Sequence, residues 1–129
     1  MKKLILLLAI SLLTVSFSIA QTPHKVYCEI VGTGNIMGNK VSMIEADFGQ
    51  SISAWNTKSR ILVGDDNKAV PFNSMMDAVN YFAVRGWSLL FAYGVTDTQG
   101  MARQTAYHYV LSKEVTNDEQ IKEGIKLKE

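Results

Sequence analysis

Apolar and polar residues alternate along much of this chain, a pattern typical of β-strands that bury one face. Residues 24–33 alternate regularly and are rich in β-branched and aromatic side chains. Residues 41–48 repeat the pattern, and residues 60–64 give a shorter segment. Residues 87–96 and 103–115 are the last two segments, and residues 87–96 carry the strongest strand signal. The pattern therefore predicts five strands.

The segment between the third and fourth predicted strands changes to helical spacing. Asn73 or Ser74 is expected to cap this helix, since Asp77 stands three residues after Ser74 as in a capping box. Gly86 is expected to end the helix in the left-handed conformation that glycine adopts readily. We expect Trp87 to pack on the helix end as a core residue. The predicted apolar face of the helix consists of Met75, Ala78, Val79, Phe82 and Ala83.

Turn-forming residues separate the predicted strands. Gly-Asn pairs at residues 34–35 and 38–39 can each close a hairpin between the first two strands, so the register there stays open. Strands joined by turns predict an α+β fold, with an antiparallel sheet of four to five strands in the order β-β-β-α-β-β and one helix packed across one face. We expect residues 21–115 to form this domain. Residues 116–129 are expected to form a polar tail, where residues 116–119 fit a second capping box.

The strand predicted at residues 87–96 is apolar on both faces between residues 87 and 93. Such a strand is typical of a sheet covered on both sides. One helix covers only one side. We therefore expect the second face to meet residues 50–58, the tail, another copy of the chain or a partner.

The first 20 residues have the features of a secretory signal peptide. Lys2 and Lys3 precede an apolar run at residues 4–13. Ser18 and Ala20 then place small residues at the two positions that a signal peptidase recognises. The apolar run is too short for a membrane-spanning helix. We expect cleavage between Ala20 and Gln21, with no membrane span afterwards and a periplasmic or extracellular location.

Charge and cysteine content narrow the function classes. Without Lys2 and Lys3, 11 basic residues stand against 12 acidic ones, which gives a net charge of −1. That balance disfavours nucleic acid as a partner. Cys28 is the only cysteine, so no intramolecular disulfide can form. Its place in an alternating apolar segment predicts a buried, inert thiol.

His108 is the most attractive single residue for chemistry. A turn of two residues at Gln99 and Gly100 would place it opposite Phe91 in the last hairpin. With Cys28 it could form a nucleophile and base, but no local signature of a cysteine hydrolase is present. The alternative, which we favour, is a core histidine bonded to a tyrosine or a backbone carbonyl.

Three tyrosines flank this histidine in the predicted hairpin. Tyr93, Tyr107 and Tyr109 have apolar rings and polar hydroxyls, a combination that suits sugar stacking or anchoring of a partner protein. Together with His108 they are the candidate contact residues. Which of the tyrosines are exposed depends on a register that the sequence leaves open.

We predict no cofactor, no metal and no catalytic residue. Asp65, Asp66 and Asn67 could offer oxygen ligands to calcium, but the spacing lacks the later glutamate of an EF-hand loop, so a solvated turn is favoured. Gly32 and Gly34 superficially suggest a phosphate loop. No Gly-Lys-Ser/Thr sequence follows, so that motif is rejected.

A family resemblance covers about 40 residues. Residues 72–82, 85–89 and 107–111 together resemble small bacterial domains of unknown function, in which a helix ends in Gly-Trp-Glu-Leu and feeds a β-hairpin. Ser88 stands where those domains have glutamate. The resemblance implies a compact sheet with one helix, alone or behind a signal peptide. It implies no functional residues, because none are defined for the family.

These observations favour an exported, non-enzymatic binding or interaction module of the cell envelope, with a protein partner or a second copy bound to the uncovered sheet face. The alternative is a carbohydrate- or peptide-binding accessory domain that uses the strand tyrosines. A small hydrolase built on Cys28 and His108 carries the least weight.

Overall fold

A computed structural model describes residues 21–35, 38–51, 59–97 and 104–128. The predicted signal peptide therefore lies outside the described residues, as do the turn predicted at Gln99 and Gly100 and most of the predicted loop at residues 50–58.

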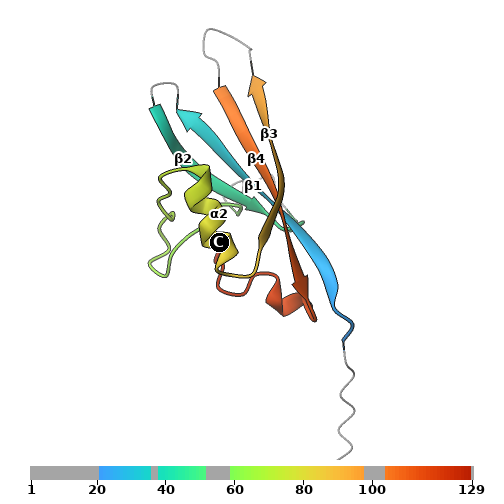
Figure 1. The fold of residues 1–129 in the computed structure, drawn as a ribbon. Coiled ribbons are helices and arrows are strands. Elements are labelled where there is room, and N and C mark those ends of the chain that lie inside the picture. The colour runs from blue at the N-terminus through green and yellow to red at the C-terminus, as the bar shows by residue number, and fades with distance from the viewer. Residues whose placement is uncertain (1–20, 36–37, 52–58, 98–103, 129) are drawn as a thin grey trace, which may run out of the picture.

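The described residues form one four-stranded antiparallel sheet and one α-helix, which confirms the predicted α+β class (Figure 1). The sheet has four strands in the spatial order β2-β1-β4-β3. The two strands nearest the chain ends, β1 and β4, therefore lie side by side at its centre. The elements are β1 (His24–Asn35), β2 (Gly38–Asp47), α2 (Met75–Ala83), β3 (Ser88–Asp97) and β4 (Gln104–Val115).

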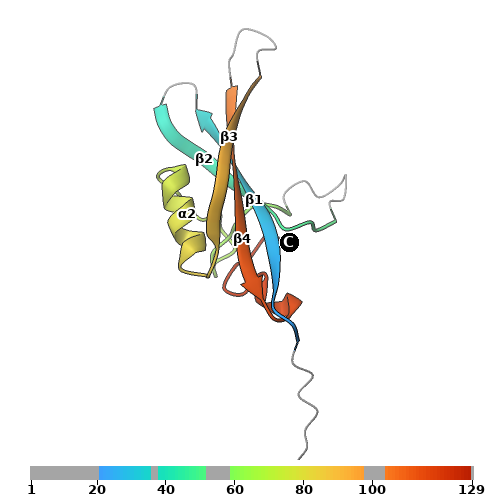
Figure 2. The same ribbon diagram turned by 45° about the vertical axis from the view of Figure 1, so that its right-hand side comes forward.

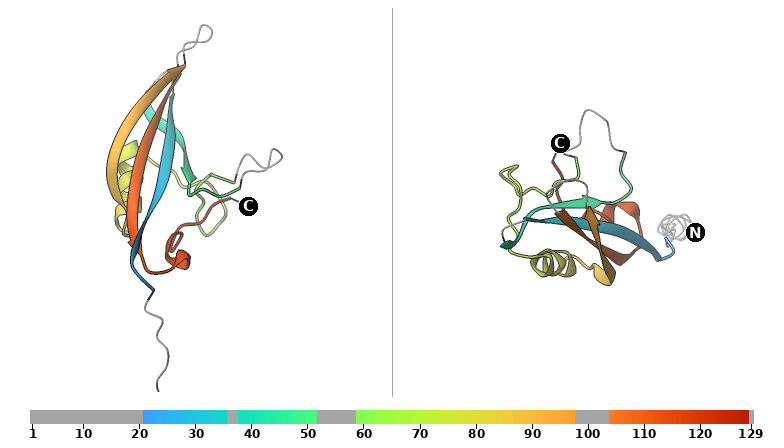
Figure 3. Two further views of the ribbon diagram at one scale, coloured as in Figure 1. Left: turned by 90° about the vertical axis from the view of Figure 1, so that its right-hand side faces the viewer. Right: turned by 90° about the horizontal axis from the view of Figure 1, so that it is seen from above.

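The position of α2 follows from this strand order. The pairs β1–β2 and β3–β4 are neighbours in sequence, while β2 and β3 lie at opposite edges of the sheet. The chain between β2 and β3 must therefore cross one face, and α2 lies within that crossing. Figures 2 and 3 show the helix against one face of the sheet. We call the other side of β1, β4 and β3 the open face.

The predicted third strand is not a full strand of the sheet. Residues 60–64 instead make isolated bridges, from Ile61 to Glu45 and from Val63 to Ala69. The turn that follows was predicted correctly: Asn67 has a φ of 58°, and the Gly64 N–H donates to the carbonyl oxygen of Lys68 at 2.9 Å. Residues 60–64 do not form a full strand because their backbone bonds are divided among three segments, namely β2, the chain after the turn and the C-terminal segment.

Both ends of α2 match the sequence prediction. The Ser74 hydroxyl accepts a bond from the Asp77 N–H at 3.2 Å, and Asp77 Oδ2 accepts one from the Asn73 N–H at 3.0 Å. At the other end Gly86 has a φ of +88°, and the Trp87 N–H donates to the Phe82 carbonyl oxygen. These bonds satisfy backbone groups that a helix end leaves unpaired.

The hydrophobic core lies between α2 and the sheet. Phe82 is fully buried, and Trp87 is 2% exposed. The Trp87 ring centroid lies 5.7 Å from that of Phe48 and 6.4 Å from that of Phe82, so its predicted role as a packing anchor is confirmed. The central cluster contains Cys28, Ile30, Ile44, Ala46, Leu62, Met75, Ala78, Phe82, Trp87, Leu111 and Ile125.

The segment after β4 is part of this core and does not stand outside the domain as a polar tail. Ile125 is only 9% exposed, and Leu127 bridges Leu62. Its helical part is a single 3₁₀ turn, η1 (Asp118–Gln120), capped by Asn117 rather than Thr116. Burial of Ile125 and the bridge at Leu127 thus order a segment whose helical signal is weak.

Candidate functional site

The four candidate contact residues divide between the two faces of the sheet. Along β1 and β4 the buried residues Cys28 and Leu111 are paired and face α2. Because side chains alternate along a strand, Tyr107 and Tyr109 share the α2 side, and His108 lies on the open face. Tyr93 pairs with His108 and lies there too. The structure therefore brings together only two of the four.

The register of the last hairpin differs from the prediction. His108 lies opposite Tyr93, and Phe91 lies opposite Val110. The expected pairing of His108 with Phe91 assumed a turn of two residues at Gln99 and Gly100. The pairing of Asp97 with Gln104 places six residues between the strands, which shifts the register by two positions and preserves the faces.

A polar cluster on the open face spans three strands. Glu29 Oε1 on β1 accepts a hydrogen bond from the Tyr93 hydroxyl on β3 at 2.6 Å. His108 Nδ1 on β4 lies 3.2 Å from the same oxygen. The rings of Tyr93 and His108 stack with centroids 4.7 Å apart and planes 11° apart. The prediction of a core histidine is therefore wrong: His108 lies outside the core and its partner is a carboxylate. The sequence did not indicate this partner, because Glu29 and His108 are 79 positions apart.

This cluster raises the pKa of Tyr93 above its ordinary value of 10.0, because the hydroxyl donates to Glu29, with smaller contributions from burial and from the Glu29 charge. We expect Glu29→Gln to lower the pKa of Tyr93. Tyrosinate absorbance is titrated in the parent and in Glu29→Gln, and each titration is repeated with Tyr93→Phe added. The difference made by Tyr93→Phe gives the titration of Tyr93 in each background. Because the pKa of Tyr93 is raised in the folded state, the protonated hydroxyl stabilises the folded state at every pH below the ordinary tyrosine pKa. This stabilisation is lost as the pH rises through the raised pKa of the folded state. Glu123→Gln, at an exposed position in the C-terminal segment, is the control and should leave the titration unchanged.

Cys28 and His108 cannot act as a nucleophile and base, because they lie on opposite faces of the sheet. Cys28 is 3% exposed, as predicted. Burial raises the pKa of its thiol to about 12, with a smaller contribution from the charge of Asp47. A thiol of this kind is protonated and unreactive at neutral pH.

The strand β3 is the most unusual feature of the surface. We expected both faces of this strand to be covered. Within the described residues they are not, since all ten residues of β3 are exposed. Its side chains on the open face are large and apolar: Phe91 is 55% exposed, Tyr93 45% and Val95 51%. We call these three side chains the β3 row. They lie at the edge of the sheet, where no described element covers them.

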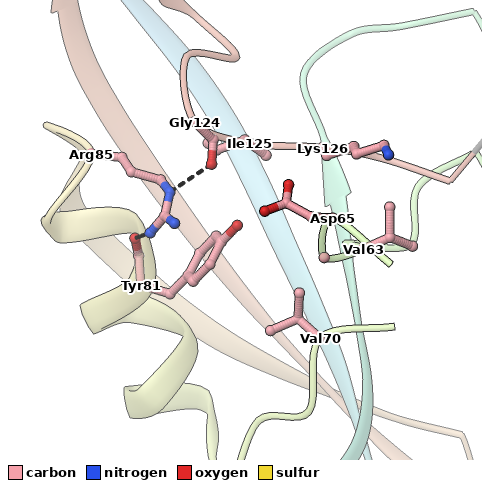
Figure 4. Close-up of a pocket in the computed structure, with 9 residues that line it drawn as sticks. Val63, Asp65, Val70, Tyr81, Arg85, Gly124, Ile125 and Lys126 are labelled. Atoms are coloured by element: carbon pink, nitrogen blue, oxygen red, sulfur yellow. Dashed lines mark hydrogen bonds between the residues drawn. The ribbon is translucent and has the colours of Figure 1, made fainter. Parts of the chain in front are cut away.

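A cleft of about 430 Å³ lies between the end of α2, the turn after residue 63 and the C-terminal segment (Figure 4). Arg85 dominates its polar side. Its guanidinium donates to the carbonyl oxygens of Gly124 at 2.7 Å and Tyr81 at 2.6 Å, and it lies 3.5 Å from the Tyr81 ring centroid. These contacts hold the C-terminal segment against α2. The role of Arg85 at the cleft is therefore explained by packing within the fold.

Neither a metal centre nor a membrane span is found in the described residues. They contain no cluster of three or more histidine, cysteine, aspartate or glutamate side chains that could hold a metal ion. None of their helices combines the length and the apolar character needed to cross a membrane.

Comparison of the chain with protein-family models, with curated proteins and with solved structures finds no match in any of the three. The resemblance to small bacterial domains with a Gly-Trp-Glu-Leu helix end therefore stays a prediction.

Proposed function

We propose that this protein is an exported, non-enzymatic interaction module of the cell envelope or extracellular space. Its contact surface is the open face of the sheet along β3 and β4. The observation that carries the proposal is the β3 row, three large apolar side chains that are each about half exposed on a rigid sheet. Exposed apolar patches on folded domains commonly mark interaction sites.

The polar cluster next to the β3 row supports the same proposal. Stacking of Tyr93 on His108 and the bonds to Glu29 fix both rings on the sheet. A surface that is ordered before binding loses little side-chain entropy when a partner docks. Aromatic anchors beside a carboxylate also supply both apolar contact and a hydrogen-bond acceptor.

The alternative is an accessory domain that binds a carbohydrate or a peptide. The positions of the tyrosines do not favour a carbohydrate as the ligand. Sugar rings stack on free aromatic faces, whereas one face of Tyr93 is covered by His108. Tyr107 and Tyr109 lie on the α2 side, and Tyr109 packs against the core. The three tyrosines therefore do not form one platform.

The proposal is tested by capture after native export. The full chain with a C-terminal tag is cross-linked in cells, and the captured polypeptides are identified and quantified by mass spectrometry. We expect a partner other than this chain in stoichiometric amount, and a loss of at least about tenfold with Phe91→Ser, because an apolar anchor is removed from the contact.

Met76→Ser provides a matched control. Met76 is 53% exposed on α2, against 55% for Phe91, so both changes remove a half-exposed apolar side chain from the surface. Capture should be unchanged with Met76→Ser. Equal capture by both variants, or the absence of any partner, would contradict the proposed contact surface.

A further inference from the structure

The outer edge of β3 offers its backbone to another strand. Within the described residues β3 is paired only with β4, on one side, and all ten of its residues are exposed. The N–H and C=O groups on the outer side of an edge strand can pair with a further strand. The opposite edge differs, because Ile61 bridges Glu45 on β2 and the Ala46 N–H donates to the Arg60 carbonyl.

The features that usually prevent an edge strand from pairing with another chain are weak in β3. Residues 88–96 contain no charged residue and no proline. Natural edge strands commonly carry lysine, proline or a bulge, each of which hinders pairing. The one irregularity lies between Leu89 and Phe91, near the start of the strand, so residues 91–97 continue in regular register. Residues 91–96 therefore offer an uninterrupted segment for pairing.

The character of the strand specifies its complement. A neutral strand that is apolar on both sides pairs best with another such strand, since charged residues opposite it would lose solvation. Among the described strands only β3 combines this character with an unprotected edge, so its best complement within this protein is β3 itself. Antiparallel pairing about a two-fold axis near Gly94 also keeps the two Asp97 carboxylates at opposite ends of the paired segment.

We propose that two copies of this chain pair antiparallel through β3 and form one continuous sheet of eight strands. The two β3 rows then lie next to each other on a joined open face, which doubles the apolar surface offered there. The pairing satisfies the outer backbone groups of both edges, and its two-fold symmetry closes the assembly at a dimer. This inference goes beyond the proposed function and does not depend on it.

The oligomeric state of residues 21–129 tests the proposal. Sedimentation equilibrium should show a dimer, and Val95→Lys should raise the dissociation constant at least about tenfold, since lysine on an edge opposes strand pairing. Val84→Lys is the matched control: Val84 is 81% exposed at the end of α2, so the same change there should leave the dimer intact. Melting by circular dichroism checks that both variants fold.

Single cysteines locate the two-fold axis. Ala92→Cys, Tyr93→Cys, Gly94→Cys and Val95→Cys are oxidised in separate proteins. Gly94 accepts a side chain, because a Cβ there lies 3.7 Å from Thr105 Cγ2, an ordinary contact. Antiparallel pairing predicts a disulfide-linked dimer at one central position, with less product on either side. Cys28 is buried, so the parent chain should stay uncross-linked.

Met76→Cys, at an exposed position on α2, is the control for cross-linking. Three results would overturn the pairing. They are a monomer at a protein concentration of about 100 μM, where weak dimers still form, a dimer that Val95→Lys leaves unchanged, or as much cross-linking with Met76→Cys as with the β3 variants. A monomer that still captures a partner would overturn the pairing alone. A dimer without a partner would overturn the proposed function alone.

Discussion

Replacing Phe82 by alanine is expected to lower the free energy of unfolding by about 4 kcal/mol. Phe82 is fully buried, and its ring contacts those of Phe48, Tyr81 and Trp87 at centroid distances of 6.3, 5.7 and 6.4 Å. The change removes apolar area and leaves a cavity between the helix and the sheet. Urea denaturation followed by circular dichroism measures the loss.

Met76→Ala is the control on the same helix. Met76 is 53% exposed, so its truncation should change the free energy of unfolding by less than about 0.5 kcal/mol. A loss below about 1 kcal/mol for Phe82→Ala would mean that α2 does not pack on the sheet as described.

Gly32→Ala is expected to destabilise the protein by about 2 kcal/mol, because the core has no room for a methyl group at this position. A Cβ there would lie 2.3 Å from Met75 Sδ, 2.7 Å from Val41 Cγ1 and 2.9 Å from Ile44 Cδ1. Met75 is flexible and can move, whereas the two β-branched residues are stiff. The same denaturation experiment measures the effect.

Gly94→Ala is the matched control for Gly32→Ala. Both glycines lie in strands, but a Cβ at Gly94 makes only ordinary contacts, at 3.7 Å or more. Its stability should be equal to or higher than that of the parent, since alanine reduces the freedom of the unfolded chain. Equal losses for the two variants would show that the cost is not due to crowding beneath α2.

The elements that local chemistry determines were predictable from the sequence. The cap at Ser74, the stop at Gly86 and the turn at Asn67 each depend on residues within a few positions of one another. Burial of Cys28 was also predictable, because alternation within one strand reveals which residues share a face.

The arrangement between distant segments was not predictable in the same way. Pairing of β1 with β4 brings Glu29 to His108, and nothing local to either residue indicates it. The apolar strand β3 was expected to be covered because its composition resembles that of a buried strand, yet its place at the sheet edge leaves it exposed. The composition of a strand indicates how much apolar surface it can bury, but not whether its place in the sheet provides a cover for that surface.

The most direct test of the proposed interaction surface compares the partner captured by the parent chain and by Phe91→Ser after native export. The proposal predicts a stoichiometric partner that is lost with Phe91→Ser and kept with Met76→Ser. Equal recovery of the same partner by all three proteins would contradict it, because binding would then not involve the open face along β3.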